Sequence, residues 1–68
     1  MIVTVNGTPQ EVPVGATVTS LVETLPGAPE GRGVAVAVEG EVIPRGAWPR
    51  TELADGSHVE VVVAVQGG

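Results

Sequence analysis

Hydrophobic and polar residues alternate with a period of two in several short stretches of the chain, as is typical of β-strands. The clearest stretch is residues 58–65 (HVEVVVAV), where valine occupies every second position and Val62 and Ala64 stand on the opposite face. Because both faces carry apolar side chains, this pattern predicts a central strand that is covered on both sides. The other stretches that we expect to form strands are residues 1–5, 12–14, 34–38 and 41–43.

Turn residues separate these predicted strands. Asn6-Gly7 tolerates the positive φ angles of a tight turn and predicts a hairpin at the start of the chain. Pro13 lacks a backbone N–H, so we expect the second strand at an edge of the sheet with the missing donor facing outward. Glu39-Gly40 and Asp55-Gly56 mark two further turns, each just before a predicted strand.

One segment follows the helical period instead. Thr17 is a suitable N-cap, and apolar residues then recur at i, i+3, i+4 and i+7, at Val18, Leu21, Val22 and Leu25. Pro26-Gly27 is expected to end this helix, and the polar residues 28–33 to connect it to the next strand. Residues 45–50 (RGAWPR) follow neither period, and we expect them to form an irregular loop.

The elements therefore follow the order β-β-α-β-β-β. Connections are short and crossovers between parallel strands are right-handed, so the helix should cross one face of a mixed sheet whose first and last strands are parallel neighbours. This α+β arrangement, with about five strands and one main helix, is the β-grasp or ubiquitin-like fold. Residues 1–65 would form a single β-grasp domain, and residues 66–68 a flexible C-terminal Gly-Gly tail.

Composition and charge narrow the possible functions. The chain holds 15 valines, no cysteine and Trp48 as its single aromatic residue, so a disulfide framework, a thiol nucleophile and a cysteine-based zinc site are excluded. Eight acidic residues against three arginines give a net charge of −5, which disfavours nucleic acid and favours a basic protein surface as partner. No stretch resembles a membrane span or a signal peptide, so we expect a cytoplasmic protein without a membrane partner.

No group of side chains indicates catalysis or metal binding. His58 is the only histidine, and we interpret it as a solvent-facing strand residue. Ser57 and His58 are neighbours on a strand and point to opposite faces, which excludes a nucleophile and base pair. The acids are spread along the chain, so no pair of carboxylates is indicated for acid-base catalysis. The glycines match neither of the phosphate-binding patterns GxxxxGKS/T and GxGxxG. The sequence thus predicts no catalytic residue, no bound cofactor and no metal site.

The last two residues suggest a different kind of function. Gly67 and Gly68 have no Cβ to block a narrow channel, so the Gly68 carboxylate can be offered to another enzyme's active site. The chain has no lysine, so one copy cannot be joined to a side-chain amine of the next. Trp48 leaves two interpretations open: a ring that covers the edge of the core, or, with Arg45, a contact for a partner.

These residues resemble a known family. Residues 33–68, together with the opening IVTVNG, are similar to the ThiS-type sulfur carriers of thiamine biosynthesis. The most specific parts are residues 34–38 (VAVAV), 42–45 (VIPR) followed by Trp48, and 64–68 (AVQGG). Two turn positions depart from the pattern, because Glu39 and Ser57 stand where asparagine and aspartate are common.

The resemblance implies a protein cosubstrate rather than an enzyme. An E1-like adenylating enzyme would use ATP to activate Gly68, a sulfur donor such as a cysteine desulfurase would supply sulfur for a thiocarboxylate, and thiazole synthase would receive that sulfur. Gly67 and Gln66 would enter the partners' sites together with Gly68. Two alternatives remain open, a sulfur carrier for molybdopterin or tRNA thiolation and a non-covalent ubiquitin-like interaction domain.

Overall fold

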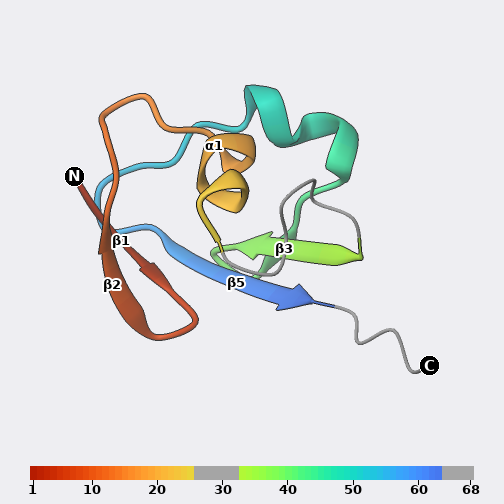
Figure 1. The fold of residues 1–68 in the computed structure, drawn as a ribbon, viewed down its shortest axis with the longest axis horizontal. Helices are drawn as coiled ribbons and strands as arrows, with labels where there is room; N and C mark the ends of the chain where they lie inside the picture. Colours follow the sequence, from red (N-terminus) through yellow and green to blue (C-terminus); the bar gives the residue numbers. More distant parts are fainter. Residues whose placement is uncertain (26–32, 64–68) are drawn as a thin grey trace.

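The computed structural model describes residues 1–25 and 33–63, which form one mixed sheet with helical segments on one side (Figure 1). The strands are β1 (Ile2–Val5), β2 (Thr8–Glu11), β3 (Val34–Val38), β4 (Glu41–Val42) and β5 (His58–Val63), in the spatial order β2-β1-β5-β3-β4. The helical segments are α1 (Val18–Glu23) and the 3-10 helix η1 (Arg45–Arg50). β1 and β5 are parallel, and the other neighbours are antiparallel. The β-grasp fold, the element order and the parallel first and last strands are confirmed.

The N-terminal hairpin turns where the sequence predicts, at Asn6 (φ 50°) and Gly7 (φ 84°). Positive φ at both central residues is the signature of a type I′ turn, whose two-residue loop sets the register of the strands that it joins. Val5 therefore pairs with Thr8. The second strand lies directly after the turn, and its prediction over residues 12–14 is wrong.

The second strand does lie at an edge of the sheet and does contain a proline, but that proline is Pro9. Met1 and Val12 exchange backbone hydrogen bonds, with N···O distances of 2.8 Å in both directions. Because paired residues in an antiparallel ladder alternate between bonded and non-bonded, the Thr4–Pro9 pair is a non-bonded one. The missing N–H faces outward at Pro9, whereas Pro13 lies beyond the strand.

The helix α1 begins at a capping box. The hydroxyl of Thr17 accepts from the Ser20 N–H (3.2 Å), and the hydroxyl of Ser20 accepts from the Thr17 N–H (2.8 Å). The helix ends at Glu23, so Leu25 lies beyond it and is half-buried. The predicted stop at residues 26–27 falls outside the described residues. The helix buries three of the four predicted apolar positions against the sheet, namely Val18, Leu21 and Val22.

The core lies between the sheet and the layer formed by α1 and η1 (Figure 1). Its members are mostly small branched side chains: Val3, Val5, Val12, Ala16, Val18, Leu21, Val22, Val36, Trp48, Leu53, Val59 and Val61. Residues 45–50 are not the irregular loop that we expected. The Ala47 N–H donates to the Pro44 carbonyl (2.8 Å), a bond between residues three apart that winds the segment into a 3-10 helix.

The position of β5 confirms one prediction and corrects another. It lies between β1 and β3, so the last strand is central as expected. Its second face is not covered, because Val62 is 65% exposed and its neighbours His58 and Glu60 are exposed as well. Both helical segments pack on the other face, and nothing among the described residues covers this one. We call it the open face of the sheet.

Candidate functional site

The predicted site residues of the tail, Gln66, Gly67 and Gly68, lie outside the described residues. What the structure describes is the base from which they continue, the end of β5. Val63 pairs with Val34 of β3, so the strand remains in the sheet up to its last described residue. β5 runs through the middle of the sheet, and its arrowhead points away from the N-terminus (Figure 1). The tail is therefore attached to a central strand, as the sequence predicts.

The start of β5 is held by the turn between β3 and β4. The His58 N–H donates to a carboxylate oxygen of Glu39 (2.6 Å), and the Glu39 N–H donates to the His58 carbonyl (2.9 Å). The hydrogen bond from the His58 backbone lowers the pKa of Glu39 below its ordinary value of 4.5, with help from the imidazole, whose Nδ1 lies 3.5 Å from the same oxygen. Burial opposes this shift. His58 is exposed, as the sequence predicts.

Ser57 and His58 do not form a catalytic pair. Ser57 is buried, and its hydroxyl accepts a hydrogen bond from the Ala54 N–H at 2.9 Å. That bond closes the turn before β5, while the imidazole of the next residue faces solvent on the other side of the strand. The structure thus gives Ser57 a structural role in the turn.

The open face carries a patch of apolar side chains beside the end of β5. The register places Val62 opposite Ala35, and Ala37 between Glu60 and Val42. Val42 is 70% exposed, so this patch is accessible to solvent. Glu60 of β5 lies within this patch, so the open face carries both apolar area and negative charge.

Trp48 and Arg45 have different roles in the fold. The Trp48 ring is 5% exposed, and its indole N–H donates to the Ile43 carbonyl at 2.9 Å. The guanidinium of Arg45 lies over this ring, 5.9 Å from its centroid. The structure therefore favours the core interpretation of Trp48, and Arg45 is the exposed member of the pair.

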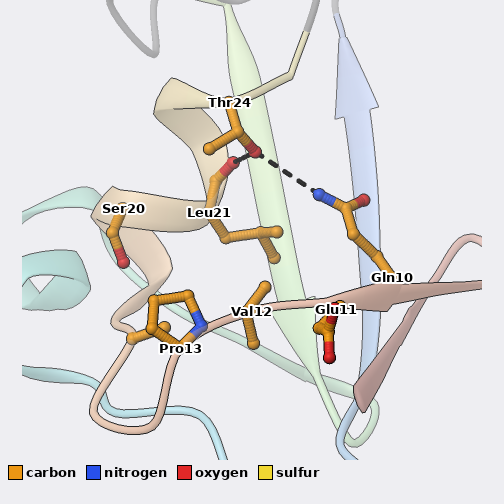
Figure 2. A pocket seen from close by; sticks show the side chains of 8 residues that line it. Gln10, Glu11, Val12, Pro13, Ser20, Leu21 and Thr24 are labelled. Atoms are coloured by element: carbon orange, nitrogen blue, oxygen red, sulfur yellow. Dashed lines mark hydrogen bonds between the residues drawn. The ribbon is translucent and has the colours of Figure 1, made fainter. Parts of the chain in front are cut away.

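A hollow of about 160 Å³ lies between β2, the connection that follows it and α1 (Figure 2). Figure 2 shows the amide of Gln10 directed toward Thr24, and their side chains form a hydrogen bond of 3.4 Å. The Thr24 hydroxyl also donates to the Leu21 carbonyl (2.7 Å), and the Ser20 hydroxyl donates to the Thr17 carbonyl (2.9 Å). Because these polar groups are already paired within the protein, we interpret the hollow as a packing gap at the sheet edge.

Within residues 1–25 and 33–63, no three acidic or histidine side chains come close enough to hold a metal ion. None of the helices in this part of the chain is long and apolar enough to cross a membrane.

Two side chains support β5 in a way that the hydrophobic pattern of the sequence does not predict. Asn6 and Glu39 were interpreted only as turn residues, yet both hydrogen-bond to the backbone of β5. The signal was present in the sequence: each precedes a glycine in a two-residue turn, and each carries a side-chain oxygen. Only the spatial order of the strands shows that both turns flank the same strand.

Comparisons with known proteins agree on one family. The model of the ThiS family matches residues 3–68 of the chain. A crystal structure of the thiamine biosynthesis protein ThiS from Geobacter metallireducens is 37% identical, with a TM-score of 0.80 and 100% of both chains covered. An NMR solution structure of a thiamine biosynthesis protein from the same organism is also 37% identical, with a TM-score of 0.80, and covers 100% of this chain and 88% of the other. No curated protein matches the sequence.

Proposed function

The chain belongs to the ThiS family, and from this membership we propose that it is a sulfur carrier of thiamine biosynthesis. The observation that carries the proposal is the extent of the family match, which runs from residue 3 to residue 68 and includes Gly67 and Gly68. The placement of β5 supports it, because a central strand gives the tail a rigid base. On this proposal the chain is a cosubstrate, and its partners perform the catalysis.

The chemistry begins with activation of Gly68. A carboxylate is a poor electrophile, so an E1-like partner joins it to the α-phosphate of ATP and releases pyrophosphate. The terminal sulfur of a persulfide, supplied by a donor such as a cysteine desulfurase, then displaces AMP from the acyl-adenylate. A thiol cleaves the resulting acyl disulfide and leaves the thiocarboxylate. ATP is thus bound by the partner, and the carrier itself holds no cofactor.

Thiazole synthase is the proposed acceptor of this sulfur, and the cytoplasm the proposed place of the reaction. The tail must enter two different active sites, one for activation and one for sulfur delivery. Gln66 and Gly67 enter with Gly68, and the absence of a Cβ on the last two residues removes the side chains that would clash there.

The open face is the surface that we propose for partner contact. Its apolar patch around Val62 and Val42 is exposed next to the base of the tail. Glu60 adds negative charge to this face, and the chain as a whole carries a net charge of −5. A partner with an apolar contact bordered by basic residues would be complementary to it.

The proposal is tested by pyrophosphate exchange. The intact chain should support ATP–pyrophosphate exchange by an E1-like adenylating enzyme, and a variant that lacks Gly68 should not. Binding of each form to the same enzyme is measured in parallel. A variant that binds but does not exchange supports the carrier role, whereas equal exchange with and without Gly68 would contradict it. If the intact chain binds without supporting exchange, and binding survives removal of Gly67 and Gly68, a non-covalent interaction domain is the better account.

A further inference from the structure

The two sides of β5 differ near its end. On the side of β3, the ladder continues to the last described residues, where Ala35 pairs with Val62 and Val34 with Val63. On the side of β1, the backbone ladder stops earlier, because the chain leaves the sheet at the Asn6-Gly7 turn. The last backbone hydrogen bond on this side runs from the Asn6 N–H to the Val59 carbonyl, at 2.9 Å.

The side chain of Asn6 continues the ladder where the backbone of β1 stops. The Val61 N–H donates to Asn6 Oδ1 at 2.8 Å, and Asn6 Nδ2 donates to the Val61 carbonyl at 3.0 Å. A carboxamide has the same donor and acceptor as a peptide group, so it replaces one rung of the ladder. Without the Asn6 carboxamide, the Val61 N–H and the Val61 carbonyl would both lose their hydrogen-bond partner on this side.

The backbone conformation of Asn6 restricts what can replace it. Its φ of 50° lies in the left-handed region, which asparagine, aspartate and glycine tolerate better than other residues. Of these three, only asparagine can both donate to and accept from the Val61 backbone. Glycine keeps the turn and loses both hydrogen bonds. Ionised aspartate keeps the turn, accepts from the Val61 N–H and places an oxygen against the Val61 carbonyl.

We infer that Asn6 is a positioning residue for the tail: its amide holds Val61 in the sheet and thereby limits fraying of β5, the strand that leads to Gly68. The inference rests on the proposed carrier function. Its physical basis is entropy, because every residue that frays from the strand lengthens the thread that a partner must order before Gly68 reaches the reacting phosphate. A strand that is held in the sheet at Val61 keeps that thread short.

The test compares Asn6→Gly with the parent chain by hydrogen exchange. Thr4 is the internal reference, because its N–H donates to the Ser57 carbonyl (2.8 Å) in the same β1–β5 ladder but at the start of β5. We expect Asn6→Gly to accelerate exchange of the Val61 amide by about tenfold or more relative to that of Thr4. Asn6→Asp should give a smaller acceleration. Equal acceleration at Val61 and Thr4 would show that the variant only lowers global stability.

The role in positioning is tested by kinetics with the adenylating enzyme. Asn6→Gly should raise the KM for the carrier several-fold and leave kcat nearly unchanged, because at saturating carrier concentration the enzyme still captures the tail. Thr17→Ala is the matched control: it removes a helix cap and leaves the end of β5 untouched, so its KM should equal that of the parent chain. A KM unchanged in Asn6→Gly, with Val61 exchange accelerated, would overturn the positioning role and leave the bond purely structural.

Failure of the two proposals can be told apart. If the parent chain is not adenylated by any competent enzyme, the carrier function is wrong. Backbone ¹⁵N order parameters at Val62 and Val63 then still decide whether Asn6 orders the end of the strand. A fall in both values in Asn6→Gly, but not in Thr17→Ala, supports the inference, and unchanged values contradict it.

Discussion

Two turn residues stabilise β5 through their side chains at opposite ends of the strand. Glu39 accepts from the backbone of His58 at its start, and Asn6 exchanges two hydrogen bonds with Val61 near its end. Both have positive φ, of 52° and 50°. The resemblance to the family marks position 39 as one where asparagine is common, and the structure shows that the glutamate found here also reaches the neighbouring strand.

Acid should weaken the contact between Glu39 and β5. The folded protein lowers the pKa of Glu39, so the stability that this carboxylate contributes is fully present above its ordinary value of 4.5 and is lost as the pH falls through the lower folded value. Glu39→Gln removes this titration. The difference in Tm between the parent chain and the variant should therefore be smaller at pH 3 than at pH 7, as measured by thermal circular dichroism. A difference that stays constant or grows toward pH 3 would show that the interaction does not depend on the charge.

Loss of the Trp48 indole N–H should destabilise the fold. Trp48→Phe removes the indole N–H and leaves the Ile43 carbonyl without its donor, which should cost about 1–3 kcal/mol of stability. Arg45→Ala, on the exposed side of the same ring, should change stability by no more than about 0.5 kcal/mol. Urea unfolding followed by circular dichroism measures both. If the two variants were equally stable, the hydrogen bond from the Trp48 indole to the Ile43 carbonyl would not stabilise the fold as its geometry indicates.

At the scale of elements, short-range patterns predicted the strands and turns, and tertiary register decided where they begin. Val12 and Val14 alternate around Pro13 like a strand, but the tight turn at Asn6-Gly7 starts the strand earlier, on the polar residues TPQE. Val12 then fills the core and Val14 is 88% exposed in the connection that follows.

The open face was missed for a related reason. An apolar residue on the second side of a strand indicates burial, but it does not tell whether the covering element belongs to the same chain. Val62 was therefore expected to be buried, and the structure leaves it exposed. The site at the tail stays a prediction from local sequence, because Gln66, Gly67 and Gly68 lie outside the described residues. The hydrogen bonds from Asn6 and Glu39 to β5 depend on the spatial order of the strands, which the hydrophobic period of the sequence does not give.

A negative charge at Val62 tests whether the open face contacts a partner. Val62→Glu should change the free energy of unfolding by less than about 1 kcal/mol, because the side chain is exposed on the sheet. It should nevertheless raise the KM of the adenylating enzyme for the carrier by about tenfold or more, since a charge would enter the apolar contact. Val14→Glu carries the same change to an exposed valine in the connection after β2 and should leave the KM unchanged. Equal KM values for the two variants would place the contact elsewhere.

At the scale of the whole molecule, the parallel pairing of β1 and β5 separates the N-terminal amine from the base of the tail. Thr4 pairs with His58, so Met1 and Val63 stand on opposite ends of these strands. Eight residue steps of a strand span ~26 Å, whereas the five residues after Val63 reach at most ~17 Å. If Gly68 is activated as we propose, its tail therefore does not reach the Met1 amine, and the 68 residues contain no lysine.

The molecule should therefore accumulate an activated tail without reacting with itself. After activation, denaturing gel electrophoresis and mass spectrometry should show no cyclised chain. A species of the parent mass minus one water, which resists cleavage by thiols, would indicate an internal amide and would contradict this geometry.

Intact mass tests the central claim most directly. The protein is incubated with an E1-like enzyme, ATP and a sulfur donor, beside a variant that lacks Gly68, and then treated with a thiol-directed alkylating agent. Because the chain has no cysteine, a species that is alkylated once carries a sulfur at its carboxyl end. Replacing one oxygen by sulfur changes the mass almost as much as adding one oxygen, so oxidation of Met1 or Trp48 gives a similar mass shift, but an oxidised chain is not alkylated. We predict one alkylated product that requires both ATP and Gly68. No such product with an enzyme that activates its own carrier would contradict the assignment as a sulfur carrier.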